Sequence, residues 1–149
     1  MPRVERSASV VWEGSSAKGS GLITAATGAF VGLPYSEPTR IAMPEGETSP
    51  EELVAAAHAG CYAMSLAGEL TKLRVRPLRL RVNATTTLDE VEGRGHLIVS
   101  SALDVVVDGP GLDERTLQEA TRAAHDGCTL SSLIRASADV TINARLEET

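Results

Sequence analysis

The sequence has few aromatic side chains and no excess of positive charge. Its 149 residues include one Trp, two Tyr and one Phe, which are too few for the stacking surfaces that bind single-stranded nucleic acid. Acidic residues outnumber basic residues by 20 to 14, so the net charge is −6. This charge balance argues against a protein that coats a phosphate backbone or an anionic membrane surface.

Long apolar runs are also missing. The stretch 19–36 is interrupted by glycine and proline, and the stretch 53–68 is too short to span a bilayer and contains His58 and Ser65. The segment 1–14 carries charges of both signs and no apolar region. We therefore expect no signal peptide, no membrane span and a cytoplasmic location.

Cysteine is scarce as well, with Cys61 and Cys128 the only two. Two cysteines cannot form the disulfide framework of a small secreted domain, and neither belongs to a CxxC motif or a zinc-type Cys/His cluster. We find no site for a metal, haem or flavin in the sequence, and expect no such cofactor. In the cytosol, thiols stay reduced unless they are redox-active. From the residues alone, the two cysteines are either inert core thiols or a reactive pair, and both interpretations stay open.

The length and the ordinary composition favour one domain over residues 1–149. Hydrophobic periodicity and turn residues predict an α+β fold in which strands, a helix, strands, two helices and a strand follow one another. We expect a loop at 33–38, strands at 4–13, 21–31, 39–43, 73–87, 96–107 and 139–146, and helices at 49–72, 113–126 and 128–136.

The strongest local signal starts at Ser49. Ser49-Pro50-Glu51-Glu52 matches a capping box with proline at the first helical position. The Ser49 hydroxyl is expected to accept from the Glu52 amide, and Glu52 to reach back to Ser49. The helix that follows is rich in Ala and Gly and is apolar on almost every face, so we expect it to lie centrally in the core.

The segment 49–61, Ser-Pro-Glu-Glu-Leu-Val-Ala-Ala-Ala-His-Ala-Gly-Cys, resembles the signature of the OsmC/Ohr family of organic hydroperoxide reductases. In that signature the peroxidatic cysteine follows the first glutamate by ten residues, as Cys61 follows Glu51. Arg40, after Thr39, resembles the arginine of the OsmC branch. Cys128 resembles the second family cysteine, although Thr129 stands where many members have proline.

The resemblance implies an OsmC-like fold, with antiparallel sheets around a central buried helix, in an intertwined homodimer with active sites at the interface. It implies that the Cys61 thiolate reduces organic hydroperoxides, and hydrogen peroxide as a further substrate, and becomes a sulfenic acid. Cys128 then forms a disulfide with it. The implied reductant is a dithiol, the dihydrolipoyl group of lipoylated proteins, and the implied role is defence against oxidative and osmotic stress.

Thiol ionisation alone does not make a fast peroxidase. Lowering the pKa of a thiol from ~8.5 to ~5.5 raises the thiolate fraction near pH 7.4 roughly fourteenfold, which is worth about 1.5 kcal/mol. The remaining rate must come from orienting the peroxide and stabilising the leaving oxygen, tasks that suit a guanidinium. We assign these tasks to Arg40, and to Glu51 the task of holding that guanidinium in place.

Helix geometry separates these groups within one chain. Glu51 and Cys61 are about 15 Å apart along a helix axis and about 80° apart around it. If both serve one site, the simplest arrangement uses two chains, with Arg40 and Glu51 facing the Cys61 of a second copy. A monomer would then have no complete site.

Two alternatives stay open. The first is a homodimer of the same fold without catalysis, which binds a small apolar ligand in the interfacial cleft. The second is a cysteine hydrolase that uses Cys61 with His58, although no third orienting group or oxyanion motif is visible. His58 is otherwise expected to be a packed or hydrogen-bonded residue of the helix.

Overall fold

A computed structural model describes residues 2–42, 45–76 and 78–148. The chain packs as two compact units, Met1–Leu53 and Val54–Thr149. We call them the first and the second unit and describe each by itself. The single domain over residues 1–149 stays a prediction.

The first unit contains a three-stranded antiparallel sheet in the order β1-β2-β3. Its strands are β1 (Ala8–Glu13), β2 (Ser20–Ala25) and β3 (Leu33–Tyr35). Gly21 of β2 pairs with Trp12 on one side and Tyr35 on the other. The two rings lie 5.5 Å apart between centroids, and a side chain at position 21 would collide with both. Glycine therefore lets the aromatic residues of the outer strands meet across β2.

Two predictions for this unit were wrong. The segment 33–38 begins with β3 rather than being all loop, because Pro34 is tolerated on an edge strand. The expected strand at 39–43 is instead helix α1 (Glu37–Ile41), with residue 43 outside the described residues. The Thr39 hydroxyl accepts from the Ser36 amide at 2.9 Å and donates to the Ser36 carbonyl at 2.8 Å. These bonds close the first helical turn, which a β-branched residue would otherwise disfavour.

Helix α2 (Pro50–Lys72) begins and ends as predicted. The Ser49 hydroxyl accepts from the Glu52 amide at 3.1 Å, which is the expected N-cap. The reciprocal half of the capping box was predicted wrongly. The Glu52 carboxylate accepts from the Thr48 hydroxyl at 2.9 Å instead of reaching back to the Ser49 amide.

The second unit contains a sheet in the order β4-β5-β6. Its strands are β4 (Arg79–Val91), β5 (Gly95–Asp108) and β6 (Asp139–Leu146). β4 and β5 form an antiparallel hairpin, but β6 pairs with β5 in parallel, unlike the antiparallel pairing that we expected throughout. Helices α3 (Glu114–Gly127) and α4 (Thr129–Arg135) connect β5 to β6 and provide the long crossover that a parallel pair needs.

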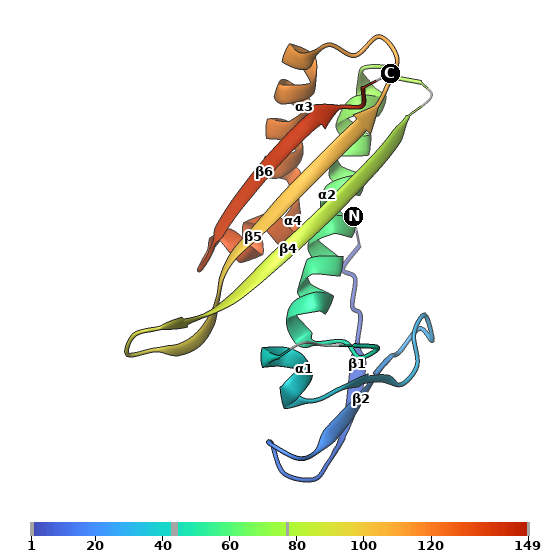
Figure 1. Cartoon of the computed structure of the whole chain (residues 1–149). Helices are drawn as coiled ribbons and strands as arrows, with labels where there is room; N and C mark the ends of the chain where they lie inside the picture. The colour runs from blue at the N-terminus through green and yellow to red at the C-terminus, as the bar shows by residue number, and fades with distance from the viewer. Residues whose placement is uncertain (1, 43–44, 77, 149) are drawn as a thin grey trace. The chain divides into compact units, whose positions relative to one another are not determined.

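The three helices of this unit lie on one face of the sheet (Figure 1). Their buried face forms one apolar core with the strands. The fully buried side chains of that core include Tyr62, Leu66, Leu70, Val105, Val107, Leu117, Ala124 and Cys128. The opposite side of α2 is open in the single chain, where Met64 is 78% exposed. The α+β class is confirmed, whereas complete burial of α2 would need a second copy of the chain and stays a prediction.

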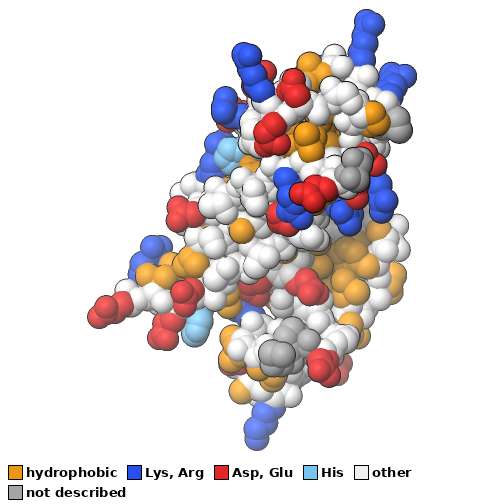
Figure 2. Space-filling model, turned by 45° about the horizontal axis from the view of Figure 1, so that its top comes forward, with side chains coloured by type: hydrophobic (Ala, Val, Ile, Leu, Met, Phe, Trp, Pro, Cys, Tyr) orange, Lys and Arg blue, Asp and Glu red, His pale blue; other side chains and the backbone are white. Residues whose placement is uncertain are grey.

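The surface carries charges of both signs. Figure 2 shows acidic and basic side chains interspersed over the visible face. None of the helices within residues 2–42, 45–76 and 78–148 has both the length and the apolarity needed to cross a membrane.

Candidate active site

The second unit brings the two cysteines together. Cys61 lies on α2 and is partly buried, whereas Cys128 precedes α4 and is 1% exposed. Both thiols are free, and the Cys128 thiol hydrogen-bonds to Cys61. The two sulfur atoms therefore lie within reach of one another although 67 residues separate them in the sequence (128 minus 61).

Cys61 faces the start of α4. Its sulfur lies 3.4 Å from the Thr129 hydroxyl, and the amides of Thr129 and Leu130 also hydrogen-bond to it. Burial acts to raise the pKa of the Cys61 thiol. The hydrogen bonds from Thr129, Leu130 and Cys128 outweigh it and lower the pKa below its ordinary value. This environment favours the thiolate, the nucleophilic form of cysteine.

Cys128 is the N-cap residue of α4. Its sulfur accepts a hydrogen bond from the Ser131 amide at 3.4 Å. At most helix N-termini this acceptor is a side-chain oxygen of Ser, Thr, Asp or Asn. The predicted helix boundary at Gly127 and Cys128 is confirmed. The sulfur thus satisfies a backbone donor of the helix that also faces Cys61.

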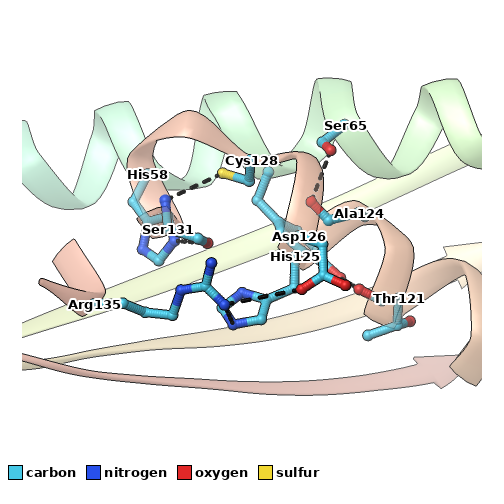
Figure 3. A network of polar contacts seen from close by, with 10 residues as sticks. His58, Ser65, Thr121, Ala124, His125, Asp126, Cys128, Ser131 and Arg135 are labelled. Carbon is cyan, nitrogen blue, oxygen red and sulfur yellow. Dashed lines mark hydrogen bonds and ion pairs between the residues drawn. The ribbon is translucent and has the colours of Figure 1, made fainter. Parts of the chain in front are cut away.

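His58 is fully buried on the face of α2 that packs against the sheet. Its Nδ1 lies 2.6 Å from the Ser101 hydroxyl of β5, and its Nε2 lies 2.8 Å from the Ser131 hydroxyl of α4. Figure 3 shows the ring beside Ser131 and Cys128. Burial, and then the nearby His125, lower the pKa of His58, so the ring is neutral. Because both ring nitrogens bind serines, His58 is not paired with Cys61, and the hydrolase alternative loses its base.

Arg40 and Glu51 form an ion pair in the first unit. Arg40 lies in the last turn of α1 and Glu51 in the first turn of α2. The Arg40 Nε atom donates to the Glu51 Oε1 atom at 2.8 Å. The arginine side chain is 47% exposed, whereas Glu51 is buried. Among the described residues no hydrogen-bond partner reaches the buried Glu51 Oε2 atom.

The predicted site residues thus form two pairs, Cys61 with Cys128 and Arg40 with Glu51. Each pair belongs to one unit, and the expectation that a second chain joins them stays a prediction. Across the part of the chain that the structure describes, no group of three or more His, Cys, Asp or Glu side chains could hold a metal ion.

Sequence reasoning missed two buried serine residues near the thiols. Ser101 and Ser131 bind His58, which lies 43 and 73 residues earlier in the chain. Such partners have no local signal. Thr129 did stand out, because the resemblance described above implies proline at its position, and its hydroxyl contacts Cys61.

The sequence matches known proteins over most of its length. Residues 43–143 match the family model described as "OsmC-like protein". The chain is 34% identical over 138 residues to "Peroxiredoxin OsmC" of Escherichia coli (strain K12), covering 91% of this chain and 92% of that protein. It is 30% identical over 97 residues to "Organic hydroperoxide resistance protein" of Xanthomonas axonopodis pv. citri, covering 64% of this chain and 65% of that protein.

The fold also matches solved structures. The organic hydroperoxide resistance protein OhrB of Bacillus subtilis superposes with a TM-score of 0.70 at 26% identity, covering 93% of this chain and 98% of that chain. An OsmC-like protein of unknown function from Vibrio cholerae superposes with a TM-score of 0.76 at 19% identity, covering 96% of this chain and all of that chain (100%). At 19% identity, the second likeness concerns the fold alone.

Proposed function

The chain belongs to the OsmC-like protein family, and we propose that it is a thiol-dependent peroxidase that reduces organic hydroperoxides, with hydrogen peroxide as a further substrate. The observation that carries this proposal is the partly buried Cys61 thiol, whose pKa is lowered beside a second free thiol. The relatives named peroxiredoxin and organic hydroperoxide resistance protein support it. The proposed role is cytoplasmic defence against oxidative and osmotic stress.

The first step is nucleophilic. The Cys61 thiolate attacks the terminal oxygen of the hydroperoxide, so an S–O bond forms and the O–O bond breaks. The sulfur becomes a sulfenic acid, and the alkoxide leaves and takes a proton to become the alcohol. The donors at the start of α4 lower the pKa of the Cys61 thiol and so favour the thiolate that attacks.

The second step closes a disulfide. The sulfur of Cys128 attacks the sulfur of the Cys61 sulfenic acid, an S–S bond forms, and the S–O bond breaks. The thiol proton of Cys128 leaves with the hydroxyl as water. A dithiol, for which we propose the dihydrolipoyl group of a lipoylated protein, then reduces the disulfide by thiol–disulfide exchange and becomes a cyclic disulfide itself. No metal, haem or flavin takes part in these steps.

Arg40 and Glu51 would act on the peroxide. The Glu51 carboxylate uses one oxygen to orient the Arg40 guanidinium, whose other N–H groups can bind the peroxide oxygens in a fixed fork. An acceptor buried without a partner costs roughly 1–3 kcal/mol, which favours a further donor on the Glu51 Oε2 atom when the site is complete.

We also propose that the complete site forms in a homodimer. The single chain exposes several large apolar side chains in each unit. In the first unit these include Val10, Val11 and Leu22, and in the second Met64 and Leu133. A second copy that covers them would also supply the Arg40 and Glu51 pair to the Cys61 of its partner.

A single-turnover thiol count tests the proposed function. Reduced protein is mixed with one equivalent of an organic hydroperoxide or, separately, of hydrogen peroxide, and thiols are counted after denaturation. We expect a rapid loss of both thiols per chain in the wild type, no loss in Cys61→Ser, and the loss of Cys61 alone in Cys128→Ser. The oxidant that reacts faster identifies the substrate class.

The opposite result has a clear meaning. Thiols that survive, or that react no faster than free cysteine, would overturn the peroxidase and leave the ligand-binding homodimer as the better account.

A further inference from the structure

His58 is an unusual group to bury beside a redox centre, since its ring takes no part in the two chemical steps above. The His58, Ser101 and Ser131 side chains are all fully buried. They come from α2, β5 and α4, so the imidazole connects three elements of the second unit. A buried polar group that lost either of these bonds would bear a desolvation cost. The network is therefore a rigid link between α2 and the start of α4.

The protonation state of His58 determines which of its hydrogen bonds the ring donates and which it accepts. A neutral imidazole donates from one ring nitrogen and accepts at the other. One serine hydroxyl therefore donates to His58 and the other accepts from it. Burial, and then the nearby His125, lower the pKa of His58 and so favour the neutral ring. His125 itself lies beside Arg135 and Asp126 (Figure 3).

Ser131 carries the link onward to the thiol. Its hydroxyl binds the Nε2 atom of His58 at 2.8 Å, and its amide donates to the sulfur of Cys128 at 3.4 Å. The same residue is thus held by His58 through its side chain and holds Cys128 through its backbone. Figure 3 shows this series of contacts from His58 through Ser131 to Cys128.

We propose that His58 is a positioning residue for the disulfide-forming step, because through Ser131 it holds Cys128 at the distance and angle from which its sulfur attacks the oxidised Cys61. This inference rests on the proposed function and extends it. It assigns His58 to the second step only, since the groups that hydrogen-bond to Cys61 do not include it.

The competing reaction makes this role measurable. A Cys61 sulfenic acid that waits for Cys128 can meet a second hydroperoxide, which transfers an oxygen atom to the sulfur and leaves as the alcohol. The product is a sulfinic acid, which a dithiol does not reduce. A misplacement of about 1 Å can slow a positioned reaction by roughly 100-fold. Loss of the link should therefore divert the oxidised enzyme from the disulfide to the sulfinic acid.

The test separates the two steps in Ser131→Ala and His58→Leu. Each reduced protein is mixed with one equivalent of organic hydroperoxide and quenched over time. Mass spectrometry then follows the sulfenic acid, trapped by a dione reagent, and the disulfide. We expect the Cys61 thiol to disappear at the wild-type rate and the disulfide to form about 10- to 100-fold more slowly. With excess hydroperoxide, the sulfinic fraction should rise by a similar factor.

Ser65→Ala is the matched control. Ser65 lies one turn after Cys61 on α2, and its hydroxyl donates to the Ala124 carbonyl of α3 at 2.8 Å. This variant loses a comparable hydrogen bond between α2 and a neighbouring helix but leaves the link to Cys128 intact. Its partition between disulfide and sulfinic acid should match the wild type.

A conservative replacement and a folding check complete the design. His58→Gln keeps a donor and an acceptor on one side chain and should recover part of the rate of disulfide formation. Circular dichroism shows whether His58→Leu folds. If it does not, the comparison of Ser131→Ala with the wild type tests the inference. An unchanged partition in Ser131→Ala, or an equal change in Ser65→Ala, would overturn the inference. A wild-type protein that keeps both thiols would instead overturn the proposed function itself.

Discussion

The two candidate pairs differ in how fully their polar groups are hydrogen-bonded within their own unit. Around the thiols, Cys61, Cys128 and His58 all hydrogen-bond to groups of the second unit. In the first unit, Arg40 is 47% exposed, and Glu51 has one buried oxygen without a partner among the described residues. The part that would carry the redox chemistry is thus built within one unit, whereas the part that would hold the peroxide has hydrogen-bonding capacity left for a ligand or a second chain.

This comparison separates thiol activation from peroxide orientation. The groups that lower the pKa of Cys61 are Thr129, Leu130 and Cys128, all of which lie in the second unit. Within the single chain, Arg40 is not among them. Reactivity toward a simple alkylating reagent and reactivity toward a peroxide should therefore respond to different residues.

The largest expected effect is that of Arg40→Ala. Without the guanidinium, the rate of Cys61 oxidation by an organic hydroperoxide should fall roughly 100- to 1,000-fold, because the leaving oxygen loses its stabilising donors. Alkylation of Cys61 by iodoacetamide should keep its wild-type rate. Stopped-flow oxidation and timed alkylation measure the two rates.

Two variants sharpen this result. Arg40→Lys keeps the charge but not the fork of donors, so it should recover only part of the rate. Arg115→Ala removes another arginine–carboxylate pair, an exposed one with Glu119, and should behave as the wild type. A parallel fall of oxidation and alkylation in Arg40→Ala would refute the separation of the two roles.

The second prediction concerns which chain supplies Arg40. Purified Cys61→Ser and Arg40→Ala proteins are each expected to be nearly inactive. If the site forms between two chains, unfolding and refolding the mixture should recover about a quarter of the wild-type activity per chain. This follows because random pairing makes half of the dimers mixed and each mixed dimer holds one complete site.

In the control mixture both proteins carry Cys61→Ser, and the second also carries Arg40→Ala. No chain then supplies the Cys61 thiol, so this mixture should stay inactive. If the mixture of Cys61→Ser and Arg40→Ala recovers nothing although sedimentation shows mixed dimers, then each site belongs to a single chain. In that case the proposed exchange of Arg40 between copies is wrong.

The parts of this fold that the sequence predicted are those with strong local signals. Helix α2 follows from Ser49 and Pro50, and the predicted break between the helices 113–126 and 128–136 matches the boundary between α3 and α4. The alternating strand 139–146 has the bounds of β6. Its parallel pairing with β5 could not be predicted, because period-two alternation identifies a strand and not its neighbour.

The errors and omissions arise where one contact decides the structure. The β-branched Thr39 favoured a strand, but its hydroxyl binds both backbone polar groups of Ser36 and starts α1, which carries Arg40. Cys61 and Cys128 were identified through a motif, whereas the serines that bind His58 come from distant segments. Motifs identified the reacting atoms, but the groups that hold them depend on tertiary packing.

The smallest expected effect is that of Thr129→Val, and it tests the activation of the thiol alone. The Thr129 hydroxyl lies 3.4 Å from the sulfur of Cys61 and helps to lower the pKa of that thiol. A lowered pKa means that the thiolate predominates down to a lower pH than in free cysteine. Valine keeps the shape of threonine without the hydroxyl, so the pH profile of Cys61 alkylation should move toward higher pH. Thr129→Ser keeps the hydroxyl and should keep the wild-type profile.

The direction of the pKa change determines the pH range in which wild type and Thr129→Val differ. Above both pKa values the thiol is ionised in either protein, so alkylation of wild type and Thr129→Val should converge at alkaline pH. Below them the valine variant holds less thiolate and should react a few-fold more slowly. Peptide mass spectrometry assigns the alkylation to Cys61 rather than to the buried Cys128. A profile that does not move would mean that the Thr129 hydroxyl is dispensable, and that the amides at the start of α4 and the Cys128 thiol suffice to hold the thiolate.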